Sequence, residues 1–341
     1  MALDRNPLDR ILAKDTPILV TGAGGFIGGH LVADLRRQGF SRIRAVDIKP
    51  VEHWFQAFDD TEILVLDLRD RHACRTAARG GGVVFNLACD MGGMGFIEAH
   101  KTDCMLSVLI NTHLLMAAHE SGCSRYLFAS SACVYNGDKQ CFPDSPALKE
   151  DDAYPALAED GYGWEKLFGE RLCRHYGEER GLVTRVARLH NVYGPLGAYD
   201  GGREKAPAAL ARKVATAKLT GGSSLEIWGD GLQTRSFTYI DDCLYGLQAI
   251  FAADYAAPIN LGSAELVSID QLADMLEEVA GLRLERSYDP SAPRGVRGRS
   301  SDNTLIRSVL NWEPSTPLRS GIARLYAWIE GELRSSGLRS S

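Results

Sequence analysis

The 341-residue sequence predicts an α/β fold: a doubly wound parallel sheet with a smaller mixed α/β domain towards the C-terminus. Two observations lead to this prediction. Short apolar runs alternate with stretches of helical periodicity up to Pro195, as a parallel sheet requires. The first apolar run also ends in a glycine-rich turn that leads directly into a helix. Beyond Pro195 the alternation loosens, which predicts the second domain.

The bulk properties exclude several classes of protein. The formal net charge of −6 argues against a nucleic acid as partner. No apolar run is long enough to span a bilayer and the first residues carry no apolar signal core, so no membrane association is expected. The eight cysteines show no C-x-x-C pair and no zinc-finger spacing, so no metal site is predicted. Scattered cysteines suit a reducing compartment, and the predicted location is cytoplasmic.

The glycine turn has the spacing G-x-x-G-x-x-G, formed by Gly22, Gly25 and Gly28 after the apolar run 17–20. Glycines let the backbone turn tightly and approach a pyrophosphate, which then lies at the N-terminus of the following helix. A glycine motif alone is a weak signal. With a strand before it and a helix after it, the motif predicts a Rossmann-type dinucleotide site.

The next strands predict which dinucleotide binds. A second strand over 43–46 ends at Asp47, where a carboxylate would bind the ribose hydroxyls of NAD and repel the additional phosphate of NADP. The alternative is an ordinary strand-end aspartate. A third strand is predicted over 64–68, and its polar end could reach the adenine. The predicted cofactor is NAD, with contacts from Gly22, Gly25, Phe26, Ile27, Gly28, Asp47, Asp67, Leu68, Tyr162 and Lys166.

Three more strands complete the predicted sheet, and the segments that follow them are candidates to form the site. The strands are expected at 83–88, 126–130 and 185–189, with a helix over 111–121. The segments after the strands are a loop rich in glycine and methionine (89–97), 131–135 and 190–195. Open α/β sheets place their sites at the carboxyl ends of strands, so these segments are expected to meet there.

The remainder of the chain is predicted to form a cap over the sheet. A loop leads into a helix near Leu210, and residues 225–239 suggest a hairpin that returns towards the sheet. Ser268 and Gln271 form a capping-box pattern before a helix over 272–280. The predicted division is 1–187 with roughly 236–264 for the NAD-binding domain, roughly 188–235 with 265–335 for the substrate domain, and 336–341 for a flexible tail.

The stretch from Tyr162 to Lys166 is the central candidate for chemistry. The two residues are four apart and would share one face of a helix. An ammonium beside a phenol favours the phenolate, so such a tyrosine can exchange a proton near neutral pH. The alternative is a chance pair on an exposed helix.

Four stretches add a family resemblance to this pair. They are Asn86–Ile97, Ala129–Tyr135, Gly201–Ala208 and Gly229–Thr238. With them the chain resembles the extended short-chain dehydrogenases/reductases that act on nucleotide sugars, and within these the GDP-mannose 3,5-epimerases. The superfamily resemblance extends from the turn at Thr21 to the turn at Trp312. Two stretches depart from the family pattern, 98–100 and 136–140, and both could line the substrate.

The resemblance implies roles for particular residues. Tyr162 would be the catalytic base, with its pKa lowered by Lys166 and with Ser131 as hydroxyl partner. Cys133 and Lys205 would move protons on the sugar ring; alternatively, they are a small buried side chain and a solvated lysine. The implied substrate contacts are Gly92, Ser131, Ala132, Cys133, Asn191, Glu204, Lys205, Ala206, Lys213, Gln233, Arg235, Arg297 and Arg299. The resemblance further implies a GDP-hexose substrate and a homodimer.

These residues suit a reaction through a transient ketone. The C–H bond of an unactivated sugar carbon is not acidic, but a ketone at C4 makes the hydrogens at C3 and C5 acidic. A base on one face of the ring and an acid on the other could then invert either carbon. NAD would end unchanged. From GDP-mannose the products would be GDP-L-galactose, GDP-L-gulose or both.

Two other interpretations stay open at the level of sequence. One is another nucleotide-sugar enzyme, a 4-epimerase or a 4,6-dehydratase. A 4-epimerase needs no additional ring base, and a dehydratase usually carries an Asp-Glu pair where this chain has Ala132 and Cys133. The other is a non-catalytic NAD-sensing scaffold, which would not need an intact set of Ser131, Tyr162 and Lys166.

Overall fold

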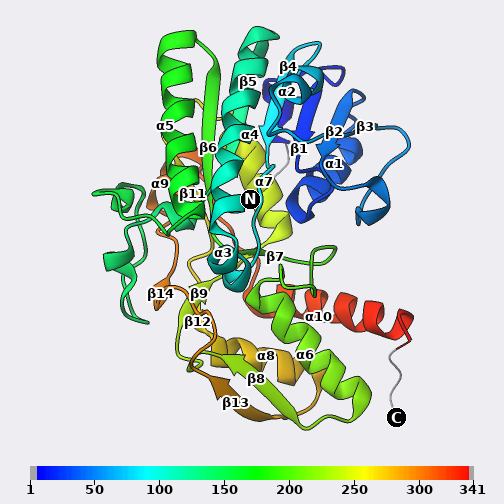
Figure 1. Cartoon of the computed structure of the whole chain (residues 1–341), viewed down its shortest axis with the longest axis vertical. Coiled ribbons are helices and arrows are strands. Elements are labelled where there is room, and N and C mark those ends of the chain that lie inside the picture. The colour runs from blue at the N-terminus through cyan, green and yellow to red at the C-terminus, as the bar shows by residue number, and fades with distance from the viewer. Residues whose placement is uncertain (1–5, 338–341) are drawn as a thin grey trace.

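The computed structural model describes residues 6–337, and its largest element is a seven-stranded parallel sheet (Figure 1). In spatial order the strands are β11 (Ile259–Leu261), β6 (Val183–Leu189), β5 (Cys123–Ser131), β4 (Gly82–Asn86), β1 (Ile18–Thr21), β2 (Ile43–Asp47) and β3 (Glu62–Val65). The order runs outwards in both directions from β1 and β4. The predicted doubly wound sheet is therefore confirmed, and its switch point lies between these two strands.

Helices cover both faces of the sheet because successive side chains along each strand point to opposite faces. On β1, Ile18 and Val20 belong to one buried cluster and Leu19 to the other. One face is covered by α1 (Phe26–Arg37) and α7 (Ile240–Ala252), and the other by α2 (Arg71–Ala77), α4 (Lys101–Glu120) and α5 (Tyr162–Arg180). Within residues 6–337, no helix combines the length and the apolar character needed to cross a membrane.

Two predicted boundaries within the sheet region are wrong, each for a local reason. The third strand spans Glu62–Val65 and not 64–68, because Asp67 accepts a hydrogen bond from the backbone N–H of Arg69 and turns the chain. The helix predicted at 111–121 already begins at Lys101. The polar residues Ser107 and Asn111 interrupt the apolar periodicity of this helix in the sequence. In the structure both are buried and hydrogen-bonded to neighbouring elements.

The second part of the chain lies below the sheet in Figure 1 and contains three longer helices and several short strands. The helices are α6 (Ala206–Thr220), α8 (Ile269–Ala280) and α10 (Leu318–Ser335). The strands are β7 (Val192–Tyr193), β8 (Ser224–Trp228), β9 (Thr234–Ser236), β10 (Thr238–Tyr239), β12 (Leu266–Ser268), β13 (Glu285–Asp289) and β14 (Gly298–Arg299). The capping box at Ser268 and Gln271 is confirmed at the start of α8.

The hairpin predicted over 225–239 is wrong. Strand β8 pairs in parallel with β13, whereas β9 pairs with β12 and β14. Gly229 and Gly231 both have positive φ angles, 82° and 75°, and they turn the chain away from β8 before β9 begins. Positive φ favours glycine but does not specify which strand the chain joins next.

Shorter elements complete the chain. They are the helices α3 (Met94–Ala99) and α9 (Thr304–Leu310), and the 3₁₀ turns η1 (Pro7–Arg10), η2 (Val51–His53), η3 (Ala132–Val134), η4 (Gly137–Gln140) and η5 (Glu150–Ala153). Helix α9 falls within the segment predicted for the substrate domain but lies beside the sheet in Figure 1. Of the predicted tail at 336–341, residues 338–341 lie outside the described residues.

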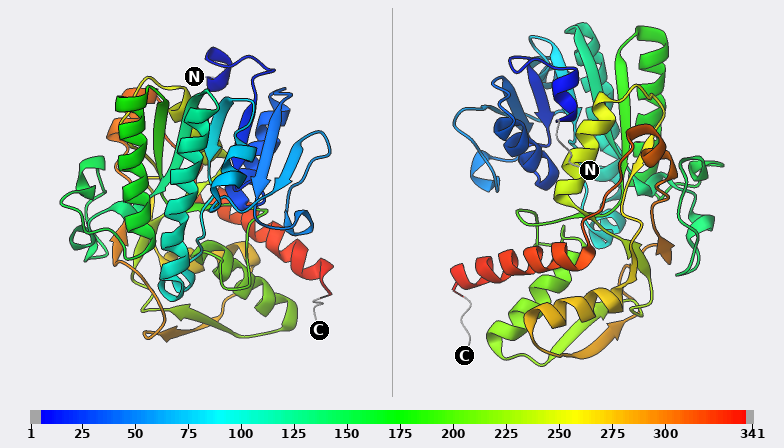
Figure 2. Two further views of the ribbon diagram at one scale, coloured as in Figure 1. Left: turned by 45° about the horizontal axis from the view of Figure 1, so that its top comes forward. Right: turned by 180° about the vertical axis from the view of Figure 1, so that it is seen from behind.

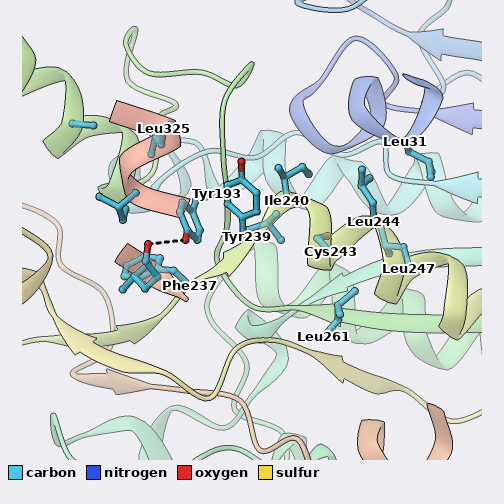
Figure 3. Close-up of a cluster of buried hydrophobic side chains, with 14 of the residues drawn as sticks. Leu31, Tyr193, Phe237, Tyr239, Ile240, Cys243, Leu244, Leu247, Leu261 and Leu325 are labelled. Carbon is cyan, nitrogen blue, oxygen red and sulfur yellow. Dashed lines mark hydrogen bonds between the residues drawn. The ribbon is translucent and has the colours of Figure 1, made fainter. Parts of the chain in front are cut away.

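Aromatic side chains join the two parts of the chain (Figure 3). Tyr193 packs edge-on against Phe237 and Tyr239, with ring centroids 6.3 Å and 5.5 Å away. The Tyr193 hydroxyl donates a hydrogen bond to the carbonyl of Leu318, at the start of α10. Helix α10 therefore sits between the sheet and the pair α6 and α8, as both views of Figure 2 show. This junction fixes the substrate-domain loops against the carboxyl edge of the sheet.

Candidate active site

The glycine turn after β1 forms a cradle that no larger residue could form. A Cβ atom on Gly28 would lie 2.1 Å from the carbonyl oxygen of Gly22, and one on Gly22 would lie 2.8 Å from the carbonyl oxygen of Leu87. Helix α1 begins at Phe26, with Gly25 as N-cap and no side chain capping it. Its first N–H groups are therefore available to an anion, and the segment fits the pyrophosphate of a dinucleotide.

We predict that Gly28→Ala removes bound NAD and lowers the free energy of unfolding by about 1–3 kcal/mol, the usual cost of overpacking. The reason is the 2.1 Å approach, which only a shift of the turn could relieve. The measurements are cofactor content after purification and thermal unfolding. Gly331→Ala is the matched control, because a Cβ there meets nothing within 4 Å. Full NAD content in Gly28→Ala would contradict the assignment of the cradle.

Asp47 occupies the predicted place at the end of β2. Its Oδ2 accepts a hydrogen bond from the N–H of Gly24 at 3.0 Å, and its Oδ1 accepts one from the N–H of Lys49 at 3.0 Å. The carboxylate is thus fixed against the glycine turn. Asp67 is exposed and pairs with Arg69 at 2.7 Å, while Leu68 is buried. The structure therefore joins Asp47 to the cradle directly and leaves Asp67 at the outer edge of the sheet.

Ser131, Tyr162 and Lys166 are brought together as predicted. Ser131 ends β5 and Tyr162 opens α5, which packs on β5. The Ser131 hydroxyl lies close enough to the phenol of Tyr162 to act against the increase in its pKa. The Nζ atom of Lys166 lies 5.5 Å from the centroid of the Tyr162 ring, so the two share one helix face.

The expected lowering of the Tyr162 pKa is not found. Burial raises the pKa of Tyr162 well above its usual value, and nearby Cys89, Cys133 and Glu165 add to the increase. The Lys166 ammonium is drawn to Glu165, with 3.2 Å between Nζ and Oε1, and both side chains are almost fully buried. The positive charge of Lys166 therefore interacts with Glu165, whereas the sequence predicted an interaction with Tyr162 alone.

The thiol of Cys89 was missed at the sequence level. Cys89 lies just after β4, within hydrogen-bonding reach of both Tyr162 and Lys166. Burial raises the pKa of this thiol above its usual value. The only sequence signal was its position directly after a predicted strand, which many loop residues share.

Cys133 lies in η3, directly after β5, and its side chain is 7% exposed. Arg299 from β14 reaches it, with 3.5 Å between Nη1 and Sγ. Burial and then the Glu159 carboxylate raise the pKa of the Cys133 thiol to about 11, and Arg299 acts in the opposite direction. Arg299 is therefore part of the surroundings of Cys133.

Lys205 is the N-cap residue of α6, and its ammonium interacts electrostatically with the thiols of Cys133 and Cys89. Burial lowers its pKa, while Cys133, Cys89 and Cys243 act to raise it. The predicted pair of Cys133 and Lys205 is thus within mutual electrostatic reach. A lysine whose pKa is lowered carries a neutral amine more often, which suits proton exchange.

Two loops with family-specific sequences pack against each other around Lys205. A Cβ on Gly92 would lie 3.1 Å from Cα of Arg203, and one on Gly93 would lie 2.3 Å from the carbonyl oxygen of Glu204. Glycine is therefore needed for this contact. The N–H of Gly93 also donates to the carbonyl of Arg203 at 3.0 Å. The position of Lys205 consequently depends on the Gly/Met loop.

Arg203 adds side-chain contacts to this packing. Its Nη1 lies 2.7 Å from Oδ1 of Asp90, and its guanidinium lies 3.9 Å from the centroid of the Phe96 ring. Arginine above an aromatic face is attracted to it electrostatically. The two loops are thereby connected by an ion pair and a stacked contact next to the proposed chemistry.

The other predicted substrate residues either open a helical element or contact other protein groups. Ala132 opens η3 and Ala206 opens α6. Two side chains donate hydrogen bonds to backbone carbonyls: Asn191 Nδ2 to Ser236 O (3.0 Å) and Gln233 Nε2 to Trp228 O (2.8 Å). Three form ion pairs: Lys213 Nζ with Glu226 Oε2 (2.8 Å), Glu204 Oε1 with Arg212 Nη2 (3.4 Å) and Arg297 Nη1 with Asp230 Oδ2 (3.0 Å). Within residues 6–337, no group of three or more His, Cys, Asp or Glu side chains is arranged to hold a metal ion.

Arg235 differs from Arg297 and Arg299, which both pair with carboxylates. Its side chain donates to the backbone carbonyls of Thr234 and Arg294, and no carboxylate in the described part of the chain forms an ion pair with it. Burial and then nearby Arg299 lower the pKa of Arg235 to about 9. A buried guanidinium without a carboxylate partner is suited to an anionic ligand.

Comparison with known proteins identifies the family. Residues 18–262 match the NAD dependent epimerase/dehydratase family. The chain is 42% identical over 330 residues to GDP-mannose 3,5-epimerase of Arabidopsis thaliana, covering 96% of this chain and 86% of that protein. It is 44% identical over 317 residues to GDP-mannose 3,5-epimerase 1 of Oryza sativa subsp. japonica, covering 93% and 82%. The chain belongs to the GDP-mannose 3,5-epimerase family.

The solved structures agree with this membership. MoeE5, in complex with UDP-glucose and NAD, is 30% identical and superposes with a TM-score of 0.76, covering 93% of this chain and 99% of that one. The family resemblance and the Rossmann-type fold predicted from the sequence are thus confirmed. As a member of the GDP-mannose 3,5-epimerase family the chain is an NAD-dependent isomerase, and the cradle of Gly22, Gly28 and Asp47 fits that cofactor.

Proposed function

We propose that the chain inverts C5, C3 or both in GDP-mannose through a transient 4-keto sugar. The products would be GDP-L-galactose, GDP-L-gulose or both. The observation that supports this most is that Cys133 packs in one buried cluster with Tyr162 and interacts electrostatically with Lys205, since simple 4-epimerisation needs no such pair. The 42% identity to GDP-mannose 3,5-epimerase of Arabidopsis thaliana supports the choice of substrate.

Bound NAD supplies the reversible oxidation at C4 that makes the hydrogens at C3 and C5 acidic. Tyr162 accepts the proton of the C4 hydroxyl and later returns it. Ser131 assists through its hydroxyl, which lies beside the phenol. Lys166 stabilises the phenolate from the same helix face, 5.5 Å from the ring centroid.

Cys133 and Lys205 exchange protons with the ring carbons. They come from different parts of the chain, η3 after β5 and the N-cap of α6, so they can approach a sugar from two sides. One group removes a proton from a carbon and the other delivers a proton to the opposite face, which inverts that carbon. Burial lowers the pKa of Lys205, which increases the share of neutral amine, and it raises the pKa of Cys133 to about 11, which favours the thiol near neutral pH.

Two arginines, Arg235 and Arg297, are proposed to bind the diphosphate of the substrate. Arg235 and Arg297 lie on β9 and just before β14, two neighbouring strands of one small sheet. Arg235 has only carbonyl partners, so a phosphate oxygen would be its first anionic one. The remaining proposed contacts to the GDP-sugar are Gly92, Ala132, Asn191, Glu204, Ala206, Lys213 and Gln233.

The experiment for this proposal is incubation of the purified protein with GDP-mannose and NAD, followed by separation and NMR of the GDP-hexoses. We expect GDP-L-galactose or GDP-L-gulose. A product that has lost water would indicate a 4,6-dehydratase, and an epimer changed only at C4 would indicate a 4-epimerase. No new GDP-hexose under any condition would favour a non-catalytic NAD-binding protein.

We also propose that the protein is a cytoplasmic homodimer, with its domains divided as the sequence predicts except that α9 belongs with the sheet. All eight cysteines lie in the described residues without a disulfide, in keeping with a reducing compartment. Helices α4 and α5 pack side by side and expose large apolar side chains: Met105 (48%), Leu106 (39%), Trp164 (40%) and Phe168 (52%). Contiguous exposed apolar surface of this kind usually belongs to an interface, and a second copy would cover it.

We predict that Phe168→Glu converts the dimer into a monomer, because it places a charge in this apolar surface. Sedimentation or light scattering measures the change. Phe142→Glu serves as control, since Phe142 is 68% exposed but lies outside α4 and α5. A dimer unchanged in Phe168→Glu would place the interface elsewhere.

A further inference from the structure

The surroundings of Cys133 contain a carboxylate that the proposed reaction has not used. Glu159 precedes α5 and is anchored to Cys133 through the backbone, with its N–H donating to the Cys133 carbonyl at 2.9 Å. A Cβ on Gly163 would lie 2.2 Å from that same carbonyl oxygen, so the start of α5 is pressed against Cys133. The backbones of Glu159 and Cys133 are therefore held close together.

Arg299 holds the two side chains in place. Its Nη2 lies 3.2 Å from Oε2 of Glu159, and its Nη1 lies 3.5 Å from Sγ of Cys133. The third nitrogen, Nε, donates to Oε1 of Gln140 at 2.6 Å. Gln140 is itself fixed, because its Nε2 donates to backbone carbonyls of Tyr135 and Asn136. All three nitrogens of Arg299 are thus engaged by protein groups.

One oxygen of Glu159 is left over. Oε2 faces Arg299, whereas Oε1 is buried and has no hydrogen-bond partner among residues 6–337. A buried carboxylate oxygen without a partner is costly, and a catalytic role is one explanation for such an atom. The carboxylate lies close enough to the Cys133 thiol to influence its ionisation.

We propose that Glu159 is the proton partner of Cys133, with Arg299 as the residue that positions both. When Cys133 acts as a base, its S–H bond breaks and an O–H bond forms on Glu159, leaving a thiolate and a neutral carboxylic acid. When Cys133 has given its proton to the sugar, the carboxylic acid of Glu159 returns one to the thiolate. The exchange moves one proton and needs no other reactant.

This arrangement addresses a difficulty of the proposed function, on which it rests. A buried thiol with a raised pKa is a poor base, since little thiolate is present near neutral pH. A carboxylate as acceptor and a guanidinium next to the sulfur would allow the thiolate to form when the sugar is bound. The other ionisable groups that face Cys133 are Tyr162, Lys205 and Arg235.

The test is Glu159→Gln, examined by two measurements. The first is the rate at which iodoacetamide alkylates Cys133 as a function of pH, followed by mass spectrometry without any sugar. Loss of the neighbouring negative charge is expected to lower the apparent pKa and to increase alkylation at pH 7 by about tenfold. The second is turnover of GDP-mannose, expected to fall by about 10²-fold or more because the acceptor is lost.

In Glu159→Gln, alkylation of Cys133 is expected to increase while turnover decreases. A residue with a merely structural role would not change the two rates in opposite directions. Parallel decreases in alkylation and turnover would overturn the proposal, and so would wild-type behaviour in both. Asp160→Asn is the matched control, since it removes the adjacent charge from an exposed residue that pairs with Lys101; both measurements should stay at wild-type values. The alkylation measurement needs no substrate, so wild-type alkylation in Glu159→Gln would overturn the coupling of Glu159 to Cys133 even if GDP-mannose is not converted.

A second variant, Glu159→Asp, controls for misfolding of Glu159→Gln. Glu159→Asp keeps the charge but shortens the side chain by one methylene group. We expect alkylation close to wild type and turnover between those of wild type and Glu159→Gln. If Glu159→Asp turned over as slowly as Glu159→Gln while both retained the wild-type alkylation profile, the carboxylate would have no role as acceptor.

Discussion

Replacing either Cys133 or Lys205 by alanine is expected to reduce the formation of epimerised GDP-hexose by about 10²–10⁴-fold, the usual contribution of a general acid or base. Each inversion needs one group to remove the ring proton and another to deliver one. Loss of either stops the cycle at the ketone stage or before it. NAD content should stay at the wild-type level, because neither residue belongs to the cradle of Gly22 and Gly28.

Epimer formation is measured by separating the products by ion exchange, and NAD content is measured by the absorbance of the bound cofactor. Cys141→Ala and Lys218→Ala are suitable controls. Cys141 is exposed, and Lys218 lies near the surface on α6, 3.5 Å from Glu330. Epimer formation at wild-type rates in Cys133→Ala or Lys205→Ala would refute the assignment of the proton-transfer pair.

Glu170→Gln is expected to lower the free energy of unfolding by about 3–5 kcal/mol, the largest effect we predict on stability. Glu170 accepts from Arg188 at both oxygens, with 2.8 Å from Nε to Oε1 and 2.7 Å from Nη2 to Oε2. The side chains are 4% and 3% exposed. Removal of the carboxylate charge leaves the buried guanidinium uncompensated. The hydroxyl of Ser130, which also donates to Glu170, loses its charged acceptor.

Denaturant unfolding measures the effect, and helix α5 itself offers the control. Glu178 pairs with Arg174 at 2.7 Å, but the two side chains are 51% and 60% exposed. Exposed pairs contribute little, so Glu178→Gln should change the free energy of unfolding by less than about 1 kcal/mol. Equal effects in the two variants would show that burial does not determine the contribution of the Glu170 pair. Because Ser130 adjoins Ser131, turnover should also fall in Glu170→Gln.

The sequence predicted those parts of the site that depend on local geometry. The glycine turn, the position of Asp47 at a strand end and the helical spacing of Tyr162 and Lys166 follow from short-range rules, and the structure places all of them as expected. The meeting of Cys133 and Lys205 was predicted only through the family resemblance. Nothing in the spacing of these two residues along the chain implies that they approach each other.

The missed features depend on contacts between distant segments. Arg299 was predicted only as a substrate contact, but it lies in β14, which pairs with β9, and from there it reaches Cys133 and Glu159. Arg299 contacts both Glu159 and Gln140, and nothing in the spacing of these three residues along the chain predicts that they meet. Glu165 was an ordinary helix residue in the sequence, and only its burial beside Lys166 reveals that it competes with Tyr162.

The transient ketone at C4 is the central claim, and one isotope measurement tests it most directly. The wild-type protein is incubated with GDP-mannose and NAD in heavy water, and NMR locates deuterium in the hexose. We predict deuterium at C5, at C3 or at both, in step with inversion at those carbons, while C4 keeps its original hydrogen. Inverted product without deuterium at the inverted carbon, or deuterium at C4, would contradict the account.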